Sequence, residues 1–187
     1  MTMPPSPEFY VSVDVETAGP NPADYSLLSI GACAVDDPGQ TFYVELQPVN
    51  QKAAPQALAI SRLSMEHLAA HGAEPPEAMA RLEAWLQETA PQGAIPICVA
   101  FNAAFDWMFI CDYFHRYLGR NPFGHSAIDI KSYYMGQAGV AWAETAMNYL
   151  APVYLQGRRL THNALEDAQE QAILFRKLLE RSRTREH

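Results

Sequence analysis

Two carboxylates stand two residues apart at the end of the first hydrophobic run, in the segment FYVSVDVETAG, residues 9–19. In an extended strand successive side chains point to opposite faces, so Asp14 and Glu16 share one face. Two like charges this close repel each other unless water solvates them or a cation lies between them. The pair alone therefore leaves two interpretations open, a solvated strand end and a metal site.

Acidic residues at two later junctions favour the metal site. In FNAAFD, residues 101–106, Asp106 falls in the first turn of an expected helix, where the helix dipole also favours an acid. In HNALED, residues 162–167, His162 and Asp167 stand at the start of the last expected helix, a position that capping would also explain. Strand ends and helix starts gather at one edge of an α/β sheet. Carboxylates converging there would suit Mg²⁺ or Mn²⁺ better than Zn²⁺.

The order of hydrophobic segments predicts the fold that would position these residues. Strands are expected over 9–16, 27–36, 41–48, 95–101 and 125–130, and helices over 61–71, 75–90, 103–119, near 131–137, 142–150 and 161–183. Short connections make the first three strands antiparallel, and the apolar run at 95–101 is typical of a strand covered on both faces. We therefore predict an α/β fold with a mixed five-stranded sheet, three antiparallel strands followed by two parallel ones, and helices on both faces.

Size and composition limit the classes of protein that fit. The 187 residues predict a single domain over 1–187, with flexible ends at 1–8 and 183–187. There is no apolar run of about 18 residues and no secretory signal, so we expect a cytoplasmic protein without a membrane span and with three free thiols. The net charge of −8 argues against a broad basic surface that coats nucleic acid, but it allows a small site for a few nucleotides.

The segments DVETAG, FNAAFD and HNALED resemble, in order, the three motifs of the DEDDh group of 3′→5′ exonucleases. This group includes the proofreading exonuclease of the bacterial replicative polymerase, ribonuclease T and oligoribonuclease. The resemblance runs from about residue 9 to residue 178 and implies a ribonuclease H-like fold. In the tyrosine version of the third motif a Tyr stands four residues before the final Asp. Here that position is Asn163, and His162 stands five before Asp167, as in the histidine version.

The resemblance implies a two-metal phosphodiester hydrolase. Asp14 would bridge two Mg²⁺ or Mn²⁺ ions, Glu16 and Asp167 would complete the coordination of the first ion, and Asp106 would help to hold the second ion through water. His162 would deprotonate the attacking water. The product would be a nucleoside 5′-monophosphate released from the 3′ end of single-stranded DNA or RNA. Because some relatives dimerise, a homodimer is also possible.

A second hypothesis, from another class, is a catalytically idle module that keeps the fold and binds nucleic acid or a partner protein. The loss of a presumed metal ligand would favour it, and none is lost in this sequence.

Several other residues are candidates for substrate binding on the same resemblance. Thr17 corresponds to a position that approaches the 3′ end, and Leu28 and Ser29 lie near where relatives place an apolar side chain against the terminal base. Packing in the core explains Leu28 and Ser29 about as well. Asn102 and Phe105 belong to the second motif, and Phe105 could either pack in the core or stack on a base.

Four basic or imidazole side chains allow two interpretations each. Arg159, with Arg158, precedes His162 and could meet phosphates, although arginines in exposed loops are common. His67 and His71 have a spacing that can bind zinc on a helix, but no third ligand is evident nearby. A solvated helix face explains this histidine pair better.

Asp129, which ends an apolar strand, is expected to cap the next helix or to support the site.

Overall fold

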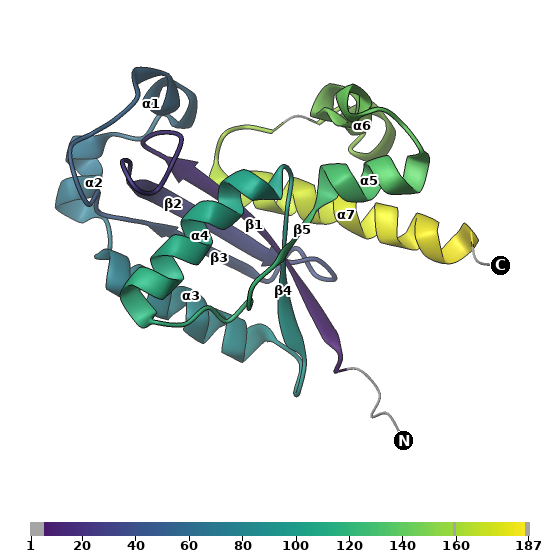
Figure 1. Cartoon of the computed structure of the whole chain (residues 1–187), viewed down its shortest axis with the longest axis horizontal. Helices are drawn as coiled ribbons and strands as arrows, with labels where there is room; N and C mark the ends of the chain where they lie inside the picture. Colours follow the sequence, from purple (N-terminus) through teal and green to yellow (C-terminus); the bar gives the residue numbers. More distant parts are fainter. Residues whose placement is uncertain (1–5, 159, 186–187) are drawn as a thin grey trace.

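The structure, a computed structural model, describes residues 6–158 and 160–185, and its five strands form one mixed sheet. The strands are β1 (Glu8–Thr17), β2 (Leu27–Ala34), β3 (Thr41–Glu45), β4 (Ile95–Ala100) and β5 (Ala127–Asp129). Their order is β3-β2-β1-β4-β5, with β1, β2 and β3 antiparallel and with β4 and β5 parallel to β1 (Figure 1). This arrangement confirms the predicted sheet.

Helices cover both faces of the sheet because the side chains of β1 alternate. Val11, Val13 and Val15 are buried in a core shared with α3 (Pro75–Thr89) and α4 (Ala103–Leu118). Tyr10 points to the opposite face and contacts Phe175 of the long helix α7 (Ala164–Arg185) edge to face. Figure 1 shows α3 and α4 on one side of the strands and α7 on the other. Asp14 and Glu16 therefore leave β1 on the α7 side.

Three short helical elements pack outside α7. They are α5 (Ile130–Ala138), the 3₁₀ turn η1 (Trp142–Thr145) and α6 (Met147–Tyr154). The prediction of one helix over 142–150 was wrong in detail, because the extended backbone at Ala146 separates the turn from α6. The helix then continues to Tyr154 despite Pro152 in its interior.

Two other helix boundaries differ from the prediction. The helix expected over 61–71 is α2 (Met65–His71), which begins later than predicted, and the preceding helix α1 (Pro55–Ser61) was not predicted. Arg62 has a left-handed backbone (φ 58°) that ends α1, and the Ser64 side chain caps α2 by accepting the amide hydrogen of His67. The last helix begins at Ala164 rather than at residue 161, because the Asn163 side chain accepts the amide hydrogens of residues 165 and 166.

One glycine sets the approach of α7 to the sheet. Gly31 lies opposite Asp14 in the β1–β2 ladder. A Cβ atom at Gly31 would lie 2.1 Å from the backbone carbon of Ala164, so only glycine lets the first turn of α7 rest directly on β2. This contact brings the start of α7 beside Asp14.

The ends and the cysteines agree in part with the predictions. Regular structure begins at Glu8 and ends at Arg185, inside both segments expected to be flexible, and residues 1–5 and 186–187 lie outside the described residues. All three cysteines are free thiols, with Cys33 and Cys98 buried and Cys111 partly exposed. No helix in the described part of the chain is long and apolar enough to cross a membrane.

Candidate active site

The carboxylates of β1 lie in the part of this strand that extends beyond its pairing with β4. The parallel pairing of β1 with β4 ends at Ser12 and Val99, so the amide of Val15 has no partner on β4. The side chain of Asp106 in the first turn of α4 accepts this N–H at 3.1 Å. Asp106 is only 4% exposed. The part of β1 that lacks a partner on β4 thus fixes Asp106 beside Asp14 and Glu16.

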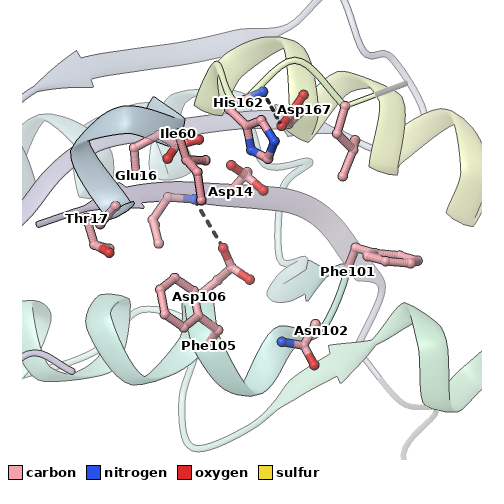
Figure 2. A pocket seen from close by; sticks show the side chains of 13 residues that line it. Asp14, Glu16, Thr17, Ile60, Phe101, Asn102, Phe105, Asp106, His162 and Asp167 are labelled. Carbon is pink, nitrogen blue, oxygen red and sulfur yellow. Dashed lines mark hydrogen bonds between the residues drawn. The ribbon is translucent and has the colours of Figure 1, made fainter. Parts of the chain in front are cut away.

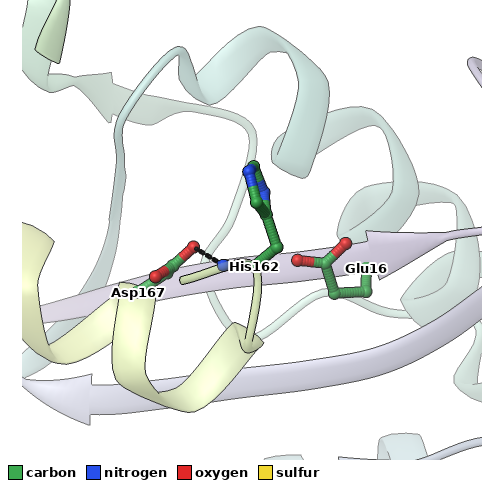
Figure 3. A group of neighbouring side chains, drawn as sticks. All are labelled: Glu16, His162 and Asp167. Atoms are coloured by element: carbon green, nitrogen blue, oxygen red, sulfur yellow. Dashed lines mark hydrogen bonds between the residues drawn. The ribbon is translucent and has the colours of Figure 1, made fainter. Parts of the chain in front are cut away.

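The start of α7 supplies the other side of the site. Asp167 accepts hydrogen bonds from the backbone N–H groups of Thr161 at 2.6 Å and of His162 at 3.0 Å. His162 has a left-handed backbone, with φ of 60°, which is costly for a residue with a Cβ atom. The two hydrogen bonds to Asp167 offset this cost and hold the exposed His162 between Asp167 and Glu16 (Figure 3).

These side chains converge on one pocket of about 270 Å³ (Figure 2). One ligand atom each from Glu16, His162 and Asp167 lies within 4.8 Å of the other two. The pocket is also lined by Asp14 and Asp106, and by Val15, Thr17, Ala57, Ile60, Phe101, Asn102, Phe105 and Leu160. The five predicted catalytic residues therefore share a single cavity.

Burial and mutual repulsion disturb the ionisation of the four carboxylates. Burial raises the pKa of Asp14 well above its usual range, and the charges of Asp106, Asp167 and Glu16 raise it further. Burial, with the charge of Asp167, raises the pKa of Glu16 to about 7. Burial also raises the pKa of Asp106 and Asp167, although backbone N–H groups that donate to both carboxylates oppose this shift.

A divalent cation fits this set of donors. Among the described residues no lysine or arginine forms an ion pair with any of the four carboxylates. Buried negative charges without partners are costly, and oxygen-rich clusters are the sites that hard cations prefer. Asp14, Glu16, Asp106 and Asp167 are the residues that could hold such ions.

Gln171 is a site residue that the sequence analysis missed. Its side chain is 1% exposed; Nε2 donates to Asp14 at 2.7 Å and Oε1 accepts the backbone N–H of Phe101 at 2.9 Å. Gln171 thereby connects α7 to the ends of β1 and β4 and fixes the orientation of the Asp14 carboxylate. Its position four residues after Asp167, on the same face of the helix, was a signal that could have identified it.

The structure brings some of the predicted substrate-binding residues to the pocket but not others. Thr17 lines the pocket and its hydroxyl donates to the carbonyl oxygen of Gly19 at 2.9 Å, and Asn102 and Phe105 also line it. Leu28 and Ser29 do not line it and are almost completely buried, Leu28 in a small cluster with Ala18 and Leu68. Arg159 lies outside the described residues.

The other candidates have structural partners. Arg158 forms an ion pair with Glu170 at 2.9 Å. Asp129 caps α5 through the amide of Ser132 and also accepts the N–H of Ala103, so it holds the starts of α5 and α4, as expected of a supporting residue. His67 and His71 are exposed, and their rings contact each other with centroids 4.6 Å apart and planes tilted by 49°.

The fold is that of the DEDDh 3′→5′ exonucleases. The nuclease domain of 3′hExo, a DEDDh family member bound to rAMP, has a similar fold, with a TM-score of 0.72, 14% identity and 92% of each chain covered. Exonuclease I of E. coli in complex with a dT13 oligonucleotide is also similar, with a TM-score of 0.70 and 19% identity over 92% of this chain and 41% of that one.

Comparisons at the level of sequence then identify the family. A model of the Rv2179c-like 3′-5′ exoribonuclease domain matches residues 10–179, and the chain belongs to this family. It is 44% identical over 169 residues to the 3′-5′ DNA exonuclease Cap18 of E. coli, with 90% of both chains covered. The chain is thus a 3′→5′ exonuclease, which confirms the predicted class of enzyme.

Proposed function

We propose that this exonuclease removes nucleotides one at a time from the 3′ end of single-stranded nucleic acid, with two Mg²⁺ or Mn²⁺ ions as cofactors. The observation that carries the proposal is the convergence of four carboxylates and one imidazole on a single pocket. This combination has little structural use without cations, because the carboxylates repel one another. The nucleoside 5′-monophosphate is the expected product.

The residues of the site would have different roles in hydrolysis. Asp14, Glu16 and Asp167 would hold one ion, and Asp14 with Asp106 the other. When bound, the ions would neutralise the charge that develops on the attacking and leaving oxygens. His162 is exposed at the mouth of the pocket, where its imidazole can accept the proton of an attacking water. Gln171 and the backbone N–H of Val15 keep the carboxylates of Asp14 and Asp106 in place.

The far side of the pocket is suited to the terminal nucleoside. Ile60 lies beside Glu16, Thr17 lies farther to the left of the view, and Phe105 lies beside Asp106 (Figure 2). An apolar side chain and an aromatic ring can cover the faces of a base. We propose that these residues, with Asn102, bind the 3′-terminal nucleotide, and that Leu28 and Ser29 support them from beneath.

Both DNA and RNA are candidate substrates, since the family is described as exoribonucleases and the Cap18 relative as a DNA exonuclease. Matched DNA and RNA oligonucleotides labelled at the 5′ end should be incubated with Mg²⁺ or Mn²⁺. We expect a ladder of shortened products with at least one of them, and no ladder with His162→Ala or Asp14→Ala.

His71→Ala is the matched control, since His71 is an exposed histidine outside the pocket. If the protein binds both oligonucleotides but shortens neither, the result would contradict the proposed function and favour the catalytically idle module that binds nucleic acid.

A further inference from the structure

A basic and aromatic cluster extends the active-site pocket along the carboxyl ends of the parallel strands. Phe101 follows β4 and lines the pocket, and Lys131 lies in the first turn of α5, directly after β5. The Nζ of Lys131 lies 5.8 Å from the centroid of the Phe101 ring and 4.1 Å from that of Trp142. The indole of Trp142 is 50% exposed. We refer to Phe101, Lys131 and Trp142 as the lysine–aromatic cluster.

The ammonium group of this cluster is free to bind an anion. Among the described residues no hydrogen-bond acceptor or carboxylate contacts the Nζ of Lys131; the contacts found for it are the two rings. Glu144, in the same turn as Trp142, instead accepts the backbone N–H of Ala141. Arg158, another cation near the site, is paired with Glu170. In a chain with a net charge of −8, an unpaired cation beside an active site is complementary to phosphate.

The two ends of the pocket are not equivalent. Thr17 and Ile60 lie on one side of the carboxylates, and Phe101 lies on the other (Figure 2). A phosphodiester held at the carboxylates places one nucleoside on each side. The terminal nucleoside ends in a 3′-hydroxyl and carries no further phosphate, whereas the remaining strand carries one phosphate per nucleotide. A phosphate-binding cation is therefore useful only at the Phe101 end.

We propose that Lys131 and Trp142 form a subsite for the substrate strand on the 5′ side of the bond that is cut, an inference that rests on the proposed function. Lys131 binds a phosphate of the retained strand, and the exposed part of the Trp142 indole stacks on one of its bases. Phe101 connects this subsite to the pocket. Stacking of bases on aromatic side chains is strong and tolerant of sequence, which suits an enzyme that moves along a strand.

Binding of two oligonucleotides tests the subsite independently of catalysis. One is a 12-mer and the other is a dinucleotide with a 5′-hydroxyl, whose only phosphate is the scissile one; both carry a fluorophore and are titrated in buffer without divalent ions. For the 12-mer we expect Lys131→Met to raise Kd about 5- to 10-fold and to make the slope of log K against log salt shallower by about 0.7, the value for one phosphate of a single strand. Trp142→Ala should raise Kd by about 5-fold or more with the same salt slope as the unmodified protein.

The controls separate a subsite from a structural role. Lys131→Met keeps an apolar stem over the two rings, and Lys131→Arg should restore both the affinity and the salt slope. Tyr149→Ala removes another exposed aromatic side chain, 56% exposed on α6, and should leave the binding of the 12-mer unchanged.

Equal losses for Lys131→Met on the 12-mer and the dinucleotide, or an unchanged salt slope for this variant, would overturn the subsite. An unmodified protein that binds the 12-mer but never shortens it with Mg²⁺ or Mn²⁺ would contradict the proposed function alone. The comparison of Kd values and slopes would then still decide for or against the subsite.

Discussion

The two walls of the active-site pocket are built in different ways. On the β1–α4 wall, Asp14, Glu16 and Asp106 come from a strand and a helix, and Asp106 is buried and bonded to the backbone of β1. On the α7 wall, His162 is exposed, lies outside regular structure and has a left-handed backbone. The acids are thus fixed by the fold, while the imidazole is placed by the hydrogen bonds of Asp167. Changes to the first wall should alter stability and metal binding as well as activity, and changes to His162 should alter activity alone.

The largest effect is expected for Asp14→Asn on the first wall. The amide oxygen can still accept the hydrogen bond from Gln171. The negative charge of Asp14, which would bind the ions and which repels the other carboxylates, is lost. We expect exonuclease activity to fall about 10⁴-fold or more. In chelator the melting temperature should rise, because the repulsion at the site is relieved. A variant that is inactive and also less stable in chelator would contradict the view that these charges are held together at a cost.

His162→Ala tests the second wall. Loss of a general base should lower kcat about 10³-fold. The exposed side chain has no core contacts to lose, so the melting temperature should change by less than about 2 °C. Steady-state kinetics and thermal unfolding of the same preparation measure both quantities. A large drop in stability would show that His162 acts through the fold of the loop rather than through the water.

Gln171→Leu affects the link between the walls. It would leave the Asp14 carboxylate and the backbone N–H of Phe101 without their shared partner. We expect about a 10-fold loss of activity, as for other residues that orient metal ligands, and a loss of about 1–3 kcal/mol in the free energy of unfolding. Gln171→Glu serves as the comparison, since it keeps an acceptor for the Phe101 N–H but replaces the donor to Asp14 by a negative charge, so in chelator it should be less stable than the unmodified protein.

The smallest effect is expected for the pH dependence of stability, and Glu16 on the first wall is the residue that tests it. Its pKa is raised from 4.5 to about 7 in the folded protein without metal, so the folded state binds this proton more tightly than the unfolded state. The stabilisation from the protonated carboxyl is fully present below pH 4.5 and is lost as the pH rises through about 7. In the presence of a chelator, the melting temperature of Glu16→Gln should therefore increase relative to that of the unmodified protein as the pH is raised from 4.5 to about 7. Saturating Mg²⁺ should reverse the difference, because the charged carboxylate binds the ion more tightly than the neutral amide does.

Much of the fold was predictable because it follows local rules. The alternation of Val11, Val13 and Val15 with Ser12 and Asp14 identified a strand with two different faces, and the short connections predicted its antiparallel neighbours. The five candidate catalytic residues, which line one pocket, could be singled out because their motifs fall at the ends of strands and the starts of helices. There the position of a side chain depends mainly on the element that carries it.

The residues that escaped prediction depend on contacts between distant segments. Gln171 lies one helical turn after Asp167, which is a local signal, but its contact with Asp14 also depends on Gly31, which lets α7 rest directly on β2. Leu28 and Ser29 are buried because β2 is covered on both faces, so they line no part of the pocket. The short helix α1, which contributes Ile60, begins after Ala54, whose side chain makes no capping hydrogen bond and so gave little local signal.

Titration of the protein with Mn²⁺ in a calorimeter tests the central claim most directly, that Asp14, Glu16, Asp106 and Asp167 form a two-ion site. In the presence of a non-hydrolysable 3′-terminal nucleotide analogue, we expect two ions per chain for the unmodified protein. For Asp14→Asn we expect one ion or none. Two ions bound with unchanged affinity by Asp14→Asn, or full exonuclease activity in an unmodified protein that binds no divalent ion, would contradict the claim.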